Sequence, residues 1–269
     1  MGFASQVPQA PLCHWIDAIW DWQGAVQPNR LERVLPVANA GVIINLAQDQ
    51  TRVYDEQRRC HYYSSMTLDG PRNRSAIIDT DEQQATMGVI FRPGAAAAFF
   101  RQRMDTLVNA SAGLEDLAGS DAVLLRESLL EAAGAAQRMG LLLRWLSSRA
   151  PETAPDRVVS RLLAALDAQP GMSALQATTL DLGLSRRMLG ERFRQAVGLS
   201  PKRYLRLQRF HRVIAAGNAG NGSRWADLSL DCGYADQAHM AHEFREFCGM
   251  TPSDYRQRRG AWDGHVAAD

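Results

Sequence analysis

GLSRRMLGERFRQAVGLSPKRY, residues 183–204, and GYADQAHMAHEFREFCGMTPSDY, residues 233–255, are two copies of one pattern. At an offset of 51 positions the copies share a phenylalanine, an arginine, a glycine, a proline and a tyrosine. These are Phe193, Arg194, Gly198, Pro201 and Tyr204 in the first copy, and Phe244, Arg245, Gly249, Pro252 and Tyr255 in the second. A repeat of this kind predicts one supersecondary unit used twice.

Each copy carries the start and stop signals of a helix-turn-helix unit. Gly183 and Gly233 take a positive φ without a Cβ clash, so each predicts the sharp end of a first helix. A second helix is expected to begin at a good N-cap residue, Ser185 in one copy and Asp236 in the other, and to stop at Gly198 and Gly249. A helix, a glycine turn and a capped helix form the helix-turn-helix pattern. The alternative is a helical repeat that packs on a protein partner.

A single helix is predicted to connect the two units. It begins at the Ser200-Pro201 start signal and continues to Gly217, with apolar residues at helical spacing on one face. At about 1.5 Å per residue it is roughly 25 Å long. That length suits an arrangement in which the second helix of each unit, the recognition helix, enters one of two successive major grooves of DNA, about 34 Å apart.

The charge is distributed unevenly along the 269 residues. Residues 156–260 hold 16 Lys and Arg against 10 Asp and Glu, and the rest holds 14 against 19. A basic C-terminal part joined to an acidic part suggests a module that binds a polyanion and a second module with another task. The chain shows no secretory signal and no apolar run long enough to span a bilayer, and its four scattered cysteines suit reduced thiols, so a cytoplasmic location is expected.

The N-terminal part is predicted to be α+β. Short β-branched or alternating runs indicate strands, namely 41–47, 51–54, 60–66, 75–79 and 86–91, which favour a small antiparallel barrel or sandwich. Two helices are expected behind it, over Ala95–Met104 and Ala122–Ser148. Two prolines mark residues 150–156 as a linker. The expected division is therefore a sensing or self-association domain over 1–149, the linker, and an all-α DNA-binding domain over 157–260.

The last 105 or so residues resemble the DNA-binding domain of the AraC/XylS family. The resemblance rests on Gly233-Tyr, Asp236-Gln-Ala-His, Phe244-Arg and the Gly249-x-x-Pro-x-x-Tyr-Arg256 pattern. Upstream, Phe91-Arg-Pro-Gly94 and the stretch from Cys13 to Trp20 resemble, more weakly, a poorly characterised N-terminal sensor-type domain. The family resemblance implies a transcriptional regulator with double-stranded DNA as its partner and no catalytic activity.

The resemblance also implies which residues face DNA. The base-facing positions fall on Arg186, Arg187, Gly190 and Glu191 in the first recognition helix, and on Gln237, Ala238, Ala241 and His242 in the second. Arg187 suits guanine, Gln237 adenine and Glu191 a cytosine amine, the alternative for each being a phosphate contact or a solvated side chain. Lys202, Arg206 and Arg245 are expected to contact phosphates. Thr178 and Thr179 stand where the family usually has an apolar pair in the first unit, and Ser229 stands at one of the corresponding positions in the second unit. Buried hydroxyl groups at these positions destabilise the packing unless they are hydrogen-bonded.

Other residues offer weaker candidate sites. Cys13, His14, Cys60 and His61 are zinc-ligand types, although adjacent residues rarely both reach one metal, and Trp15, Trp20 and Trp22 are aromatic residues that suit either a ligand pocket or a core. No catalytic or phosphate-binding motif is present, so an enzyme would need an unrecognised site in the β-rich part. We therefore expect a DNA-binding regulator without a cofactor, controlled by a small-molecule effector. RNA polymerase and a second copy of the chain are further expected partners, and no membrane is involved.

Overall fold

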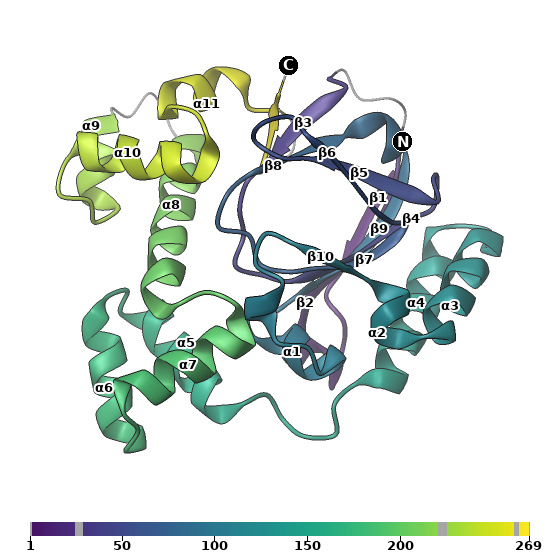
Figure 1. Ribbon diagram of the computed structural model, residues 1–269, viewed down its shortest axis with the longest axis horizontal. Helices are drawn as coiled ribbons and strands as arrows, with labels where there is room; N and C mark the ends of the chain where they lie inside the picture. The colour runs from purple at the N-terminus through teal and green to yellow at the C-terminus, as the bar shows by residue number, and fades with distance from the viewer. Residues whose placement is uncertain (1, 25–28, 220–224, 261–263, 269) are drawn as a thin grey trace.

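The computed structural model describes residues 2–24, 29–219, 225–260 and 264–268, which form a β-rich N-terminal part and a helical C-terminal part (Figure 1). The strands are β1 Gly2–Gln6, β2 Ile16–Gln23, β3 Leu31–Val34, β4 Gly41–Asn45, β5 Gln50–Tyr54, β6 Cys60–Ser64, β7 Met66–Asp69, β8 Ala76–Asp79, β9 Ala85–Phe91, β10 Ser111–Gly113 and β11 His265–Ala267. The helices are α1 Ala95–Phe100, α2 Leu114–Ala118, α3 Ser120–Glu131, α4 Ala135–Arg149, α5 Arg157–Ala168, α6 Met172–Leu182, α7 Arg186–Val197, α8 Pro201–Ala219, α9 Trp225–Asp231, α10 Gln237–Cys248 and α11 Pro252–Arg258, with short 3-10 turns η1 Leu12–His14, η2 Thr80–Glu82 and η3 Met104–Thr106. The expected fold class is confirmed.

The strands form two antiparallel sheets. The first has the order β1-β2-β9-β4-β7-β10, and the second has the order β11-β3-β8-β5-β6. The five strands expected between residues 41 and 91 are all present, with the run 60–66 ending at Ser64 and β7 beginning at Met66. Strands β1, β2 and β3 were not expected, because their sequences mix polar, charged and aromatic residues without a clean alternation.

Helices α1 to α4 pack on one face of the first sheet. Alternate residues of β4 and β9, among them Val42 and Val89, are buried in one core with Leu125 of α3 and Leu142 of α4. Arg138 of α4 also donates to the buried carboxylate of Asp21 in β2, at 2.5 and 3.0 Å. The helices therefore cover one face of the first sheet, and the other face of this sheet is turned toward the second sheet.

The prediction of two helices over residues 95–149 is wrong in its boundaries. The first ends at Phe100, where Arg101 takes a left-handed φ of 49°. The expected helix over Ala122–Ser148 is two helices, because residues 132–134 leave the helical conformation and Gly134 is fully extended. Gly134, a weak helix former, lies at this break.

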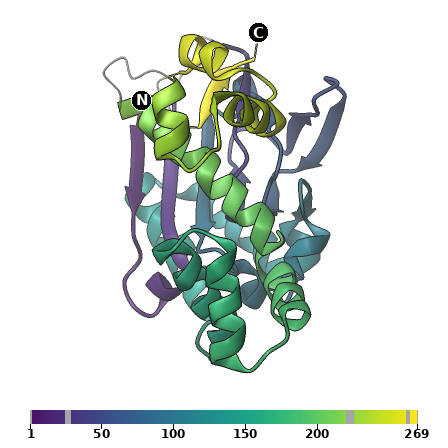
Figure 2. The same cartoon turned by 90° about the vertical axis from the view of Figure 1, so that its left-hand side faces the viewer.

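The helical C-terminal part packs around a second core, to which Leu35 and Ala38 of the N-terminal part also contribute. Helices α5–α7 and α9–α11 lie at opposite ends of α8 (Figures 1 and 2). Residues 150–156 contain no helix. The final strand β11 lies beyond the expected limit of residue 260 and pairs antiparallel with β3 of the N-terminal part. Among the described residues, no helix is long and apolar enough to cross a membrane.

Candidate nucleic-acid interface

The two expected recognition helices are present and begin at the expected caps. Ser185 accepts a hydrogen bond from the backbone N–H of Met188 at the start of α7, at 3.2 Å. Asp236 accepts one from His239 at the start of α10, at 2.7 Å. The positive φ expected at Gly183 and Gly233 is confirmed, and Gly198 and Gly249, which follow the two helices, also have a positive φ. These local signals therefore set both ends of each helix.

Helix α8 connects the two units as expected. Its 19 residues span about 28 Å at about 1.5 Å per residue. Its apolar face is buried, and the five side chains of that face are each below 7% exposure, namely Tyr204, Leu207, Phe210, Val213 and Ile214. Phe210 contacts Phe244 of α10 at a ring-centroid distance of 5.0 Å, and Tyr204 contacts Phe193 of α7 at 5.6 Å. Each recognition helix is thus packed against one end of α8.

The polar faces of the recognition helices are open. Arg186 and Arg187 are exposed on α7, and Gln237, Ala238 and His242 are exposed on α10, while Gly190 and Ala241 are half-buried. Within the described part of the chain, no hydrogen bond or ion pair engages the side chains of Arg186, Arg187 or Gln237. These side chains are available to an external partner.

Glu191 has partners within the protein. Its carboxylate accepts hydrogen bonds from Arg194 at 2.7 and 2.9 Å and from Gln195 at 2.9 Å, and these bonds lower its pKa. Arg103 of the N-terminal part lies 3.6 Å from it. A contact between Glu191 and a base therefore requires these interactions to rearrange.

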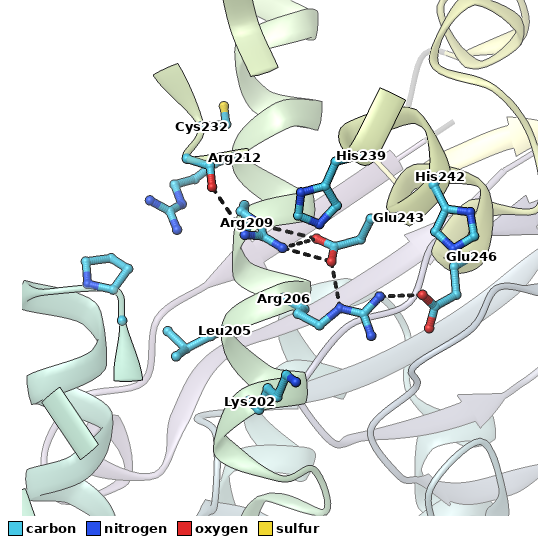
Figure 3. Close-up of a pocket in the computed structure, with 13 residues that line it drawn as sticks. Lys202, Leu205, Arg206, Arg209, Arg212, Cys232, His239, His242, Glu243 and Glu246 are labelled. Carbon is cyan, nitrogen blue, oxygen red and sulfur yellow. Dashed lines mark hydrogen bonds and ion pairs between the residues drawn. The ribbon is translucent and has the colours of Figure 1, made fainter. Parts of the chain in front are cut away.

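A groove of about 670 Å³ lies between α8 and α10 (Figure 3). Its cationic residues are Lys202, Arg206, Arg209 and Arg212 of α8, and the side chains of His239 and His242 of α10 also line it. Lys202 and Arg212 are exposed, and no carboxylate within the described residues pairs with either. Arg209 and Arg212 were missed by sequence reasoning, although Lys202, Arg206, Arg209 and Arg212 recur at three- and four-residue spacing along one face of a helix.

Two carboxylates hold other arginines of α8. The side chain of Glu243, on α10, is 2% exposed and accepts from Arg206 Nε at 2.6 Å, from Arg209 Nη2 at 2.9 Å and from Tyr234 Oη at 2.9 Å. Glu246 pairs with Arg206 and Arg203. Arg206, which is expected to contact a phosphate, thus also fixes α10 to α8. Of the other expected phosphate contacts, Lys202 and Arg245 are both exposed.

The polar substitutions in the supporting helices are satisfied internally. Thr178 donates to the carbonyl of Ala174 at 2.8 Å, and Thr179 to Gln176 at 2.6 Å. Ser229, 1% exposed, donates to Ala226 at 2.7 Å. All three hydroxyls bond to carbonyls of their own helix, so their burial carries no unpaired donor.

The weaker candidate sites do not assemble. Cys13 is half-buried in η1 beside an exposed His14, whereas Cys60 and His61 are exposed on β6, and the described residues contain no cluster of His, Cys, Asp or Glu suited to a metal. The three tryptophans also lie in different environments and do not line one pocket together. Trp15 is buried against Phe99, Trp22 is half-buried, and Trp20 lines a cavity between the sheets.

The first recognition helix packs on the N-terminal part through its C-terminal half. Arg194 Nη1 lies 3.4 Å from Asp105 Oδ2. Gly198 ends α7 with a φ of 87°, and a Cβ there would collide with Pro71 and lie 2.9 Å from the carbonyl oxygen of Met104. This contact holds one half of α7, while Arg186 and Arg187 at its other half stay exposed.

We expect Gly198→Ala to destabilise the protein more than Gly183→Ala. Both glycines have a positive φ, which costs roughly 1 kcal/mol for alanine. A Cβ at Gly183 meets nothing within 4 Å, so only Gly198→Ala adds a collision. Overpacking of this kind typically adds about 1–3 kcal/mol. Urea unfolding of both variants measures the difference, and equal losses would contradict the packing described for Gly198.

Comparisons with known proteins agree with this geometry. Residues 180–258 match a helix-turn-helix domain family, and residues 5–112 match a domain family of unknown function. The HTH-type transcriptional activator RhaR of Escherichia coli K12 is 34% identical over 107 residues, which is 39% of this chain and 36% of RhaR. RhaR of Shigella flexneri gives the same values. The match therefore spans about a third of the length of these curated relatives.

Solved structures of regulators also align with the chain. ToxT from Vibrio cholerae aligns over 96% of this chain and 97% of its own, with a TM-score of 0.45 and 10% identity. A DNA-binding transcriptional dual regulator from Escherichia coli K-12 aligns over 38% of this chain and 97% of its own, with a TM-score of 0.32 and 20% identity. The chain is thus similar to a helix-turn-helix domain family over residues 180–258 and to a domain family of unknown function over residues 5–112.

Proposed function

We propose that the protein regulates transcription by binding double-stranded DNA, with α7 and α10 in successive major grooves. The observation that carries the proposal is the pair of capped helices at opposite ends of α8, with Arg187 and Gln237 side chains that no other described residue engages. The basic groove between α8 and α10 suits the phosphates that separate two major grooves. In this proposal the base-facing residues are Arg186, Arg187, Gly190, Glu191, Gln237, Ala238, Ala241 and His242.

The proposal includes a division of labour along the chain. Residues 1–149 sense a small molecule or mediate self-association, residues 150–156 link the parts, and residues 157–260 bind DNA. The protein acts in the cytoplasm and changes the recruitment of RNA polymerase. The experiment that tests the proposal is selection of bound genomic fragments across a salt series. Tight sites whose affinity falls steeply with salt are expected, whereas weak binding without sequence preference at low salt would favour a helical repeat that binds protein.

Lys202 and Arg212 are expected to bind phosphates. Changing either to Gln should weaken binding to all sequences alike and reduce the slope of log affinity against log salt by about 1. Arg144→Gln is the matched control, since Arg144 is an exposed arginine on α4, outside the groove. A loss of affinity confined to particular sequences would instead assign the changed residue to base reading.

We also propose that the chain forms a homodimer through α3. Val123, Leu124 and Leu130 on this helix are 46–58% exposed, which is high for large apolar side chains. A second copy of the same face would remove them from water. Light scattering at micromolar concentration should give a dimer for the wild type and a monomer for Leu124→Glu. A monomeric wild type would contradict this assignment.

A further inference from the structure

A second cavity, of about 180 Å³, lies between the two sheets of the N-terminal part. The first sheet contributes Trp20, Ile43 and Asp69, and the second contributes Val53 and His265. On the first sheet, the cavity residues alternate along their strands with residues that pack against the helices. The side chains of the first sheet that point away from the helices therefore line the cavity. One wall is aromatic and aliphatic, and the opposite charges of Asp69 and Arg72 both face the space.

The two charged residues do not neutralise each other. Asp69 is half-buried and accepts a hydrogen bond from Thr67 at 2.8 Å. The Arg72 side chain is also half-buried, and within the described ranges no hydrogen bond or ion pair engages its guanidinium. A partly desolvated arginine without an acceptor favours an anionic partner, because ionised hydrogen bonds strengthen away from water.

We propose that this cavity binds a small organic acid with an apolar side chain. Its carboxylate pairs with Arg72, and an ammonium or hydroxyl group next to that carboxylate donates to Asp69. Its hydrocarbon packs on Trp20, Ile43 and Val53. The inference deepens the proposed function, on which it rests, by naming the chemical class of the effector: an α-amino or α-hydroxy acid.

The loop that carries Arg72 contacts the DNA-binding part at three points. Pro71 lies against Gly198 at the end of α7. The carbonyl of Asn73 accepts from Arg203 of α8 at 3.0 Å, and the Ser75 N–H donates to the Phe247 carbonyl of α10 at 3.1 Å. A ligand that draws Arg72 into the cavity therefore pulls on a loop that touches both recognition helices and the helix between them.

The C-terminal strand gives a second connection to the same cavity. His265 on β11 lines it and lies 2.9 Å from Glu32 on β3 through Nδ1. Backbone bonds from Leu35 to Gly264 and from Ala268 to Leu31, at 2.9 and 3.0 Å, fasten the strand to β3. Because β11 follows α11 in the chain, a ligand that touches His265 also touches the end of the DNA-binding part. Occupancy of the cavity is thereby transmitted by two routes.

Thermal unfolding of the full-length protein tests the binding site without DNA. The probes are leucine, phenylalanine and methionine with their α-hydroxy counterparts, each at millimolar concentration. At least one should raise Tm by several degrees, as a ligand that binds only the native state does. Its amide, which lacks the carboxylate, and its deaminated acid, which lacks the donor, should raise Tm much less.

Variants locate the effect. Arg72→Gln should abolish the rise in Tm, whereas Arg74→Gln should retain it, since Arg74 is an exposed arginine of the same loop. Each variant is compared with its own Tm without ligand, so a change in basal stability does not mimic the result. No rise with any probe, or a rise that survives Arg72→Gln, would overturn the inference. If the ligand raises Tm in an Arg72-dependent way but the protein selects no DNA fragments, the result would count against the proposed function and not against the ligand site.

Discussion

Replacing Glu243 with alanine should be among the most damaging single changes in the C-terminal part. Removing one partner of a buried ion pair typically costs about 3–5 kcal/mol, because the other partner keeps its desolvation penalty. Arg206 and Arg209 retain 27% and 22% side-chain exposure, so water compensates in part. We therefore expect the free energy of unfolding to fall by roughly 2–4 kcal/mol. Urea unfolding measures it.

Glu246→Ala is the matched control. Glu246 lies on the same helix and pairs with Arg203 and Arg206, but its side chain is 34% exposed. Exposed pairs contribute about 0–1 kcal/mol, so the control should lose much less stability. Equal losses would mean that burial does not set the strength of the network.

The same network gives a pH dependence with a definite sign. Burial alone would raise the pKa of Glu243, but hydrogen bonds from Arg209, Arg206 and Tyr234 outweigh burial and hold the pKa below its ordinary value of 4.5. A carboxyl with a depressed native pKa contributes stability that is complete above the unfolded-state pKa and is lost as pH falls through the native pKa. Glu243→Gln should therefore remove part of the loss of stability on acidification below pH 4.5, seen in unfolding curves at a series of pH values.

The sequence predicts the helix-turn-helix units well because their signals are local. The cap residues Ser185 and Asp236 and the flanking glycines act within a few residues of the helix ends that they set. The run Gly41–Asn45 likewise predicts its own strand, since β-branched residues favour the extended backbone. Elements of this kind need no knowledge of distant parts of the chain.

The features that sequence reasoning missed depend on distant partners. Arg206 reads as a free cation in the sequence, and only its contact with Glu243, 37 positions away, gives it a structural task. Strand β11 is only three residues long. It forms a strand because it pairs with β3, which lies more than 200 positions earlier in the sequence. The cavity with Arg72 and His265 depends on the same long-range pairing. No local pattern specifies which residues meet in these places.

Arg187→Ala and Gln237→Ala should each weaken binding to the preferred DNA site by about 1–3 kcal/mol, or roughly 5- to 150-fold. Both side chains are exposed near the N-termini of their helices, where a recognition helix meets base edges. Selection of bound fragments with each variant should show relaxed preference at a few base pairs only. The positions relaxed by the two variants should differ, because the residues lie on separate units.

The spacing of those positions is the sharper part of this prediction. If α8 holds α7 and α10 in successive major grooves, the two sets of relaxed base pairs should lie about 10 base pairs apart. Arg192→Ala is the control on α7, because Arg192 is exposed but pairs with Asp156 at 2.7 Å and is not a predicted base-facing residue. It should leave the base preference unchanged. Relaxed positions that coincide for Arg187→Ala and Gln237→Ala would show that the two helices read one groove, and the rigid spacing by α8 would then be wrong.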